Sequence, residues 1–208
     1  MRKRLLFVAM VLMVLVGRAS ADVVRIEPDD YPDYGDMTNP YPGITLWVLG
    51  SDRQRIESFK VRSRVENDGY TSTGTKVFAH EGVAFFNNNR QLRMNFAGGA
   101  SSIDVDFIGG TVLGTDIGRL EAYNSAGMLL AEDISQPLEP RIIETLSIDR
   151  PTADIAYAIV YSRSGEGNFG VVDTLVVNVV PEPGAATLLL AGAGLLTARV
   201  RRRVTPTP

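Results

Sequence analysis

Residues 92–107, LRMNFAGGASSIDVDF, decide the fold class of this 208-residue chain. Apolar and polar residues alternate in LRMNF and again in IDVDF, and Gly98-Gly99 lies between the two runs. Strict alternation puts one set of side chains in a core and the other in solvent, which is typical of a half-buried β-strand. The segment therefore predicts two strands with a turn at Gly98-Gly99.

The same period of two recurs on both sides of this segment. LEAYNSAGMLLAE predicts a hairpin, because a short glycine-containing turn separates two apolar runs. Together the strands, about ten or eleven with no convincing helix, predict an all-β fold, a β-sandwich with jelly-roll topology as the preferred version. The further strand candidates are 23–27, 44–49, 56–63, 76–79, 118–124, 127–132, 141–148, 154–161 and 175–179.

The charge of the chain is unevenly distributed. Of the 21 Lys and Arg residues, eight lie outside residues 22–183, whereas all 24 Asp and Glu residues lie inside. Residues 22–183 therefore carry 13 positive and 24 negative charges, a net charge of −11. Such a surface repels nucleic acid and is compatible with divalent cations. The chain has no cysteine, and about 160 residues can bury a core without disulfides.

The N-terminus has the three parts of a secretory signal peptide. MRKR is basic, Leu5 to Val16 is apolar, and Ala19-Ser20-Ala21 matches an A-x-A cleavage site. We therefore expect residues 1–21 to be a signal peptide, with an uncleaved anchor as the alternative. One domain over residues 22–179 is the simplest organisation of the rest.

The C-terminus combines a proline motif, an apolar run and a basic cluster. Pro181 and Pro183 hold Glu182 on an extended backbone. The uncharged residues 184–198 would form a helix roughly 22 Å long, which is short for a bilayer core of about 30 Å. By the positive-inside bias, the arginines that follow would stay on the cytoplasmic side: Arg199, Arg201, Arg202 and Arg203. A plain membrane anchor and a buried helix with a basic tail are the alternatives.

VPEP, the apolar run and RVRRR together resemble the PEP-CTERM sorting signal of certain Gram-negative bacteria. The resemblance covers residues 180–203, and residues 204–208 form a tail. It implies export and recognition by an exosortase, a membrane-embedded enzyme that processes the protein for the cell surface. TNPYPGITL, LRMNF, SIDVDFIGG and GVVDTLVV also resemble recurring blocks of exported PEP-CTERM proteins, which implies a jelly-roll or galactose-binding-like domain but no settled activity.

The sequence offers few residues for catalysis. His80 is the single histidine, there is no cysteine, and no G-x-S-x-G motif occurs. We expect His80 to be an ordinary edge or surface residue. Asp104 and Asp106 share one face of a strand and could serve as a glycosidase pair, but a solvated strand face explains them more simply. We therefore expect no enzyme.

Two binding sites follow from the remaining motifs. By strict alternation, Asp173 lies on the apolar face of its strand, so it needs a partner or a cation. Glu27 belongs to the first strand of the domain and Asp173 to the last, and such strands commonly lie close together in jelly rolls, so the two carboxylates could share a structural Ca²⁺. If it binds no ion, Asp173 would cap a loop. Tyr31, Tyr34 and Tyr41 lie on a proline-rich loop and are the candidate ligand surface.

These features predict an exported protein of the cell surface or the extracellular matrix, such as that of a biofilm, without catalysis of its own. A carbohydrate-binding module for exopolysaccharide is the first alternative. A carboxylate glycosidase is the second.

Overall fold

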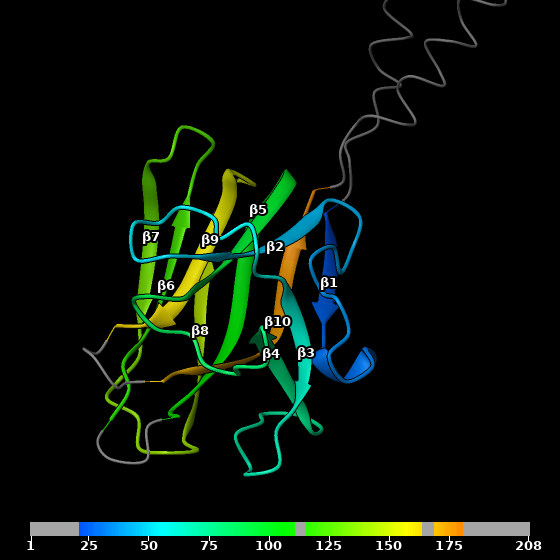
Figure 1. Ribbon diagram of the computed structural model, residues 1–208. Coiled ribbons are helices and arrows are strands. Elements are labelled where there is room, and N and C mark those ends of the chain that lie inside the picture. Colours follow the sequence, from blue (N-terminus) through cyan, green and yellow to red (C-terminus); the bar gives the residue numbers. More distant parts are fainter. Residues whose placement is uncertain (1–20, 111–114, 164–168, 181–208) are drawn as a thin grey trace, which may run out of the picture. The chain divides into compact units, whose positions relative to one another are not determined.

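The computed structural model describes residues 21–110, 115–163 and 169–180, which form ten β-strands and one short 3-10 helix, η1 (Pro28–Asp30) (Figure 1). Residues 1–20 and 181–208, which hold the predicted signal peptide and sorting signal, lie outside this description. No helix in the described part is long and apolar enough to cross a membrane. The strands are β1 (Asp22–Ile26), β2 (Ile44–Leu49), β3 (Val61–Val65), β4 (Lys76–His80), β5 (Gln91–Ile108), β6 (Gly118–Tyr123), β7 (Leu129–Ile134), β8 (Ile143–Asp149), β9 (Ile155–Ser162) and β10 (Val171–Val179).

The long strand β5 belongs to two layers of the fold. Its first half pairs with β2 on one edge and β9 on the other, and β9 continues to β6 and β7. Its second half pairs with β10 and β8, and β10 continues to β1. Figure 1 shows β5 passing through the middle of the strands. The fold is thus all-β and sandwich-like, as predicted from the alternating pattern.

The predicted turn at Gly98-Gly99 is wrong. β5 continues through both glycines, and its register shifts against both neighbours: against β9 between Asn95 and Ala100, and against β10 between Ala100 and Ser102. Gly99 has a φ of +83°, and a Cβ there would lie 2.4 Å from the carbonyl oxygen of Ala153. The glycines therefore act as a kink that takes one strand from one layer to the other, which is a frequent use of glycine inside a strand.

The core lies between the two layers. It takes residues from β2, β9 and β6 on one side and from β1, β10 and β8 on the other. The inward residues of β5 are all buried: Leu92, Met94, Phe96, Ile103, Val105 and Phe107. Those are the apolar residues of the two alternating runs, so the pattern identified the core face of this strand correctly.

The antiparallel strands β3 and β4 form a separate two-stranded sheet. Val77 and Ala79 of β4 pack in a second cluster with Ile108 and Val171, at the ends of β5 and β10. The strand predicted at 56–63 starts only at Val61. The residues before it form a turn in which the backbone N–H of Phe59 donates to Ile56 O at 3.0 Å.

His80 was expected to be an edge or surface residue; it ends β4 of the two-stranded sheet, but it is buried, so the surface position is wrong. Its ring stacks on Phe59 and meets Phe86 edge-on, with both centroid distances at 5.5 Å. The chain folds back directly after β4, since His80 and Val83 exchange backbone hydrogen bonds, and His80 Nε2 lies 3.1 Å from Phe85 O. Burial lowers the pKa of His80, which keeps the imidazole neutral in its apolar site.

Candidate functional site

The outer face of the β2–β5–β9–β6 layer carries aromatic and charged side chains. One row across the four strands is Trp47, Arg93, Ile159 and Glu121, each directly opposite the next. The neighbouring row is Thr45, Asn95, Tyr157 and Tyr123. We call this surface the ladder face, after the contacts among Trp47, Arg93, Tyr157 and Tyr123.

Consecutive members of the ladder touch across the strands. The Arg93 guanidinium carbon lies 3.7 Å from the ring centroid of Tyr157 and 5.2 Å from that of Trp47. Tyr157 in turn stacks on Tyr123, with centroids 4.9 Å apart and planes 11° from parallel. Each such contact contributes about 0.5–1.5 kcal/mol, so together they hold the three half-buried rings in defined positions.

The loop that follows β2 closes over this face with two arginines. Arg55 lies over the Trp47 ring at 4.8 Å from its centroid and forms an exposed ion pair with Glu57 at 3.2 Å. Arg53 reaches the other end of the ladder, within 6.0 Å of the Tyr123 ring. Both ends of the aromatic row are therefore covered by cations from one loop.

A buried carboxylate anchors Arg53. Glu121 accepts hydrogen bonds from Arg53 Nη1 at 2.5 Å, from the Tyr123 hydroxyl at 2.6 Å and from the Tyr161 hydroxyl at 3.1 Å, and Arg119 Nε lies 2.8 Å away. Burial pushes the pKa of Glu121 up, but the hydrogen bonds from Arg53 and Tyr123 bring it below its ordinary value. The pKa of Tyr123 rises to about 12, because the ring is buried and its hydroxyl is committed to Glu121. Glu121 is an ionised structural anchor.

Arg93 differs from the other arginines of this face. Its Nε donates to Asn95 Oδ1 at 2.7 Å, and Asn95 donates to Thr45 O at 3.1 Å. Within the described part of the chain, Arg93 has no carboxylate at ion-pair distance. Burial lowers the pKa of Arg93, since no anion replaces the hydration that the guanidinium has lost.

The structure corrects the placement of Asp173. Asp173 pairs with Asp106, but Leu175 pairs with Val105, so Thr174 is an extra residue in β10. This bulge resets the alternation, and Asp173 points away from the main core, toward the side covered by β4 and residues 72–73. Strict alternation across a bulge assigns the wrong face.

Glu27 and Asp173 meet the same short segment, Ser72-Thr73. Asp173 Oδ2 accepts hydrogen bonds from the backbone N–H groups of Ser72 and Thr73 at 2.8 and 3.1 Å. Its Oδ1 accepts from the N–H of Thr174 at 2.8 Å. Glu27 Oε2 accepts from the hydroxyls of Thr73 and Thr174, both at 2.9 Å. This is the loop-capping arrangement; the calcium site stays a prediction, and the described residues hold no group of three or more candidate ligands.

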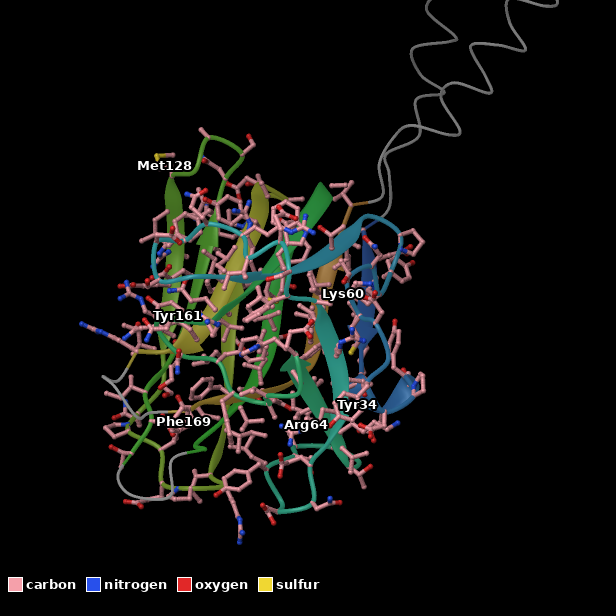
Figure 2. The ribbon with its side chains drawn as sticks, in the orientation of Figure 1. Tyr34, Lys60, Arg64, Met128, Tyr161 and Phe169 are labelled. Atoms are coloured by element: carbon pink, nitrogen blue, oxygen red, sulfur yellow. The ribbon has the colours of Figure 1, made fainter. Side chains whose placement is uncertain are left out.

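The three tyrosines of the proline-rich loop are placed differently from one another. Tyr31 packs against the core, and its hydroxyl donates to Pro40 O at 2.9 Å. Tyr34 and Tyr41 are exposed. Figure 2 shows Tyr34 and Tyr161 of β9 on opposite sides of the view. A ligand surface at this loop stays a prediction, separate from the ladder face.

The remaining predicted site residues divide into two groups. Asp104 and Asp106 are both partly exposed on the outer side of β5, and Asp106 Oδ1 accepts a hydrogen bond from the Thr145 hydroxyl at 2.7 Å. Ala21 is exposed at the start of the described residues. The cleavage residue Ala19 and the processing signal lie outside them: Pro181, Glu182, Pro183, Arg199, Arg201, Arg202 and Arg203.

The sequence contained a signal for the ladder face that the motif search did not use. In LRMNF the outward positions are Arg93 and Asn95, and in ITLWVL Trp47 lies between two core residues, Leu46 and Val48. An aromatic residue at an outward position is the unusual feature. Its partners Tyr157 and Tyr123 are far away in sequence, so only the strand order reveals the row.

No protein-family model matches the chain, and no curated protein matches it. Among solved structures, TmCBM61 in complex with β-1,4-galactotriose aligns with 64% of this chain and 88% of its own at 11% identity and a TM-score of 0.43. The alignment with the CBM22-1 xylan-binding domain of Paenibacillus barcinonensis Xyn10C covers 78% of this chain and 97% of that domain, at 11% identity and a TM-score of 0.42. The alignment with the C-terminal family 22 carbohydrate-binding module of Clostridium thermocellum Xyn10B covers 72% of this chain and 94% of that module, at 12% identity and a TM-score of 0.41. Because every one of these TM-scores is below 0.5, they carry no argument about ligand or activity.

Proposed function

We propose that the domain is a non-catalytic module of an exported protein and that it binds polysaccharide on the ladder face. The observation that supports this most is the row of half-buried aromatic rings on the outer side of a sheet, where alternation ordinarily places solvated polar side chains. Rings fixed by their neighbours lose little conformational entropy when a ligand packs on them. We propose the jelly-roll topology as the finer description of the sandwich.

Trp47 is the ring that we assign to sugar stacking. Arg55 covers it, but an exposed cation–π contact is worth about 0.5–1 kcal/mol, and an exposed ion pair such as Arg55–Glu57 about 0–1 kcal/mol. Moving Arg55 aside therefore costs about 0.5–2 kcal/mol. Packing the apolar face of a sugar ring on the indole offsets this cost, at about 25 cal/mol per Å² of apolar surface buried.

The polar groups next to the rings suit hydroxyl-rich ligands. Thr45, Asn95 and Arg93 lie in adjacent positions of β2 and β5, and they supply both donors and acceptors. Glu121 is not available to a ligand, because arginine and tyrosine donors already occupy both of its oxygens. The same saturation argues against Glu121 as one of the two carboxylates that glycoside hydrolysis requires.

Export and sorting are part of the proposal and rest on the two terminal motifs of the sequence. The signal peptide would send residues 22–179 out of the cytoplasm, to the envelope, the surface or the matrix of a Gram-negative cell. The segment 180–203 would hold the chain in the membrane until an exosortase processes it. The mass of the mature protein from its host tests this directly: processing predicts a C-terminus before Arg199, whereas a chain intact through Pro208 contradicts it.

Glycan binding is tested on an array of neutral and acidic polysaccharides, with the Trp47→Ala variant beside the wild type. We expect wild-type binding to at least one polysaccharide and a loss of at least about tenfold in the variant, equivalent to about 1.4 kcal/mol. Phe169→Ala is the matched control, because Phe169 is an exposed aromatic residue outside both the ladder face and the tyrosine loop. A wild-type protein that binds no glycan, or equal losses in the two variants, would rule out this face as the binding site.

A further inference from the structure

Arg93 is the central cation of the ladder face and the one whose charge has no anionic partner. Glu121 lies within hydrogen-bond distance of both Arg53 and Arg119, and Arg55 pairs with Glu57. Arg93 instead contacts two aromatic rings and one amide oxygen. Its Nε is used by Asn95, and no protein acceptor among the described residues takes the N–H groups of its two terminal nitrogens.

The terminal nitrogens of the Arg93 guanidinium are not among the buried polar atoms without a partner, so they still reach solvent and are open to a ligand. The guanidinium is half-buried between β2 and β9, so part of its hydration is gone, and a desolvated charge is stable only when it is paired or hydrogen-bonded. The rings of Trp47 and Tyr157 attract the cation and fix its plane, but they accept no conventional hydrogen bonds. The two terminal nitrogens form a planar fork, which matches the two oxygens of a carboxylate.

We propose that Arg93 recognises a carboxylate of the bound sugar, so that the polysaccharide taken by the ladder face is built from uronic acid units. This inference rests on the proposed function, because it assigns the ligand class of the same face. The carboxylate would receive two N–H donors from Arg93, while the carbon skeleton of the same or the next unit packs on Trp47. The hydroxyls next to the carboxylate would lie near Asn95 and Thr45.

The net negative charge of the domain does not oppose this pairing. Charges farther away than the Debye length, about 8 Å at physiological ionic strength, are largely screened. Within the two rows of the ladder face the carboxylate is Glu121, which lies directly opposite Ile159 rather than opposite Arg93. Its charge is neutralised by Arg53 and Arg119. In the covering loop, Glu57 is paired with Arg55. An anionic ligand would therefore meet mainly the field of Arg93.

The test uses matched pairs of glycans and the full chain. Isothermal titration measures binding of hexameric oligogalacturonate against its methyl ester, and of a β-1,4-glucuronate hexamer against cellohexaose. Within each pair the backbone is the same and only the carboxylate changes. We expect the acidic member of at least one pair to bind about tenfold tighter or more, and this preference to shrink as NaCl is raised.

Arg93→Gln and Arg64→Gln then separate recognition from general charge. Arg64 lies on β3, outside the ladder face, and its substitution removes the same charge. We expect Arg93→Gln to abolish the preference for the acid, Arg93→Lys to retain part of it because the charge stays but the fork is lost, and Arg64→Gln to leave it unchanged. Circular dichroism and the Tm check that each variant is folded, and the comparison within wild type stands without any variant.

The outcomes distinguish the two proposals. Equal wild-type affinity for acid and ester, with Trp47→Ala still abolishing binding, overturns the role of Arg93 and leaves glycan binding in place. Equal losses for Arg93→Gln and Arg64→Gln also overturn it, because they indicate non-specific attraction. Binding of neither member of any pair, nor of any neutral glycan on the array, removes both proposals.

Discussion

Glu121 and Asp173 are two of the buried carboxylates of the domain, and their donors hold them in opposite ways. Glu121, on the ladder face, is held by two arginines and two tyrosine hydroxyls. Asp173, in β10, is held by three backbone N–H groups and the Ser72 hydroxyl. The first set of donors is charged and comes from side chains, whereas the second is neutral and comes mostly from the backbone.

This difference determines the ionisation of the two groups. Burial pushes both pKa values up, but the arginines reverse the effect at Glu121, whereas the neutral donors at Asp173 compensate only in part, so its pKa stays raised. It also determines what each network can do. The carboxylate bound by long side chains anchors the loop after β2 beside the ladder face. The one bound by backbone groups ties β10 to the segment at residues 72–73.

The largest expected effect comes from Asp173→Ala. The substitution leaves three backbone N–H groups without their acceptor in a site that is fully buried, and each buried unsatisfied donor costs about 1–3 kcal/mol. We expect the free energy of unfolding to fall by about 3 kcal/mol or more in urea denaturation. Asp106→Ala, at the position paired with Asp173 but partly exposed, is the control and should cost less than about 1 kcal/mol. Equal losses would mean that the backbone donors find other acceptors.

Arg53→Ala should have a smaller effect on stability. It removes two hydrogen bonds to Glu121, but Arg119 remains as a counter-ion, and the Arg53 side chain is 39% exposed, so solvent screens the pair. We expect a loss of about 1–2 kcal/mol in the free energy of unfolding. Because Arg53 anchors the loop that carries Arg55, amide hydrogen exchange should rise in residues 50–55 and stay unchanged in β10. A loop that remains protected would show that Arg53 is not its anchor.

The two carboxylates should also respond to pH in opposite directions. The pKa of Glu121 lies below its ordinary value of 4.5, so its contribution is present above that value and is lost as pH falls through the folded-state pKa. The pKa of Asp173 lies above 3.8, so its contribution is greatest at low pH and is lost as pH rises through the folded-state pKa. Urea denaturation from pH 2 to 8 gives the free energy of unfolding of each protein. Two differences in this free energy are compared: wild type minus Glu121→Gln, and wild type minus Asp173→Asn. The first difference should shrink toward low pH and the second toward high pH; parallel curves would show that the donors do not set the ionisation.

Much of the fold was predictable from the sequence because period-two alternation depends only on the direction of successive side chains. The core face of β5, the hairpin of β6 and β7 and most strand positions followed from it. It failed wherever the backbone departs from regular pairing. Gly98-Gly99 looks like a turn because glycine permits both a turn and a kink, and the bulge at Thr174 inverts the assigned face of Asp173 without any glycine to mark it.

The candidate site was less predictable for a different reason. The ladder face consists of residues from four strands, and they lie up to 114 positions apart in the sequence, from Thr45 on β2 to Ile159 on β9. The strand order β2-β5-β9-β6 brings them together. No local pattern contains that order. The tyrosines clustered near the start of the domain form a local pattern and were therefore predicted as the ligand surface, although one of them, Tyr31, packs against the core.

The smallest expected effect concerns Thr174, the bulge residue that links the Asp173 network to Glu27. Its φ of +23° is unusual for a β-branched residue, and its hydroxyl donates to Glu27 at 2.9 Å. Thr174→Ser keeps the hydroxyl and removes the branch, so we expect a change within about 0.5 kcal/mol in the free energy of unfolding. Thr174→Ala loses the hydrogen bond and should cost about 1–2 kcal/mol, because Glu27 loses a donor. If the serine variant were as unstable as the alanine variant, packing of the methyl group rather than the hydroxyl would hold the bulge.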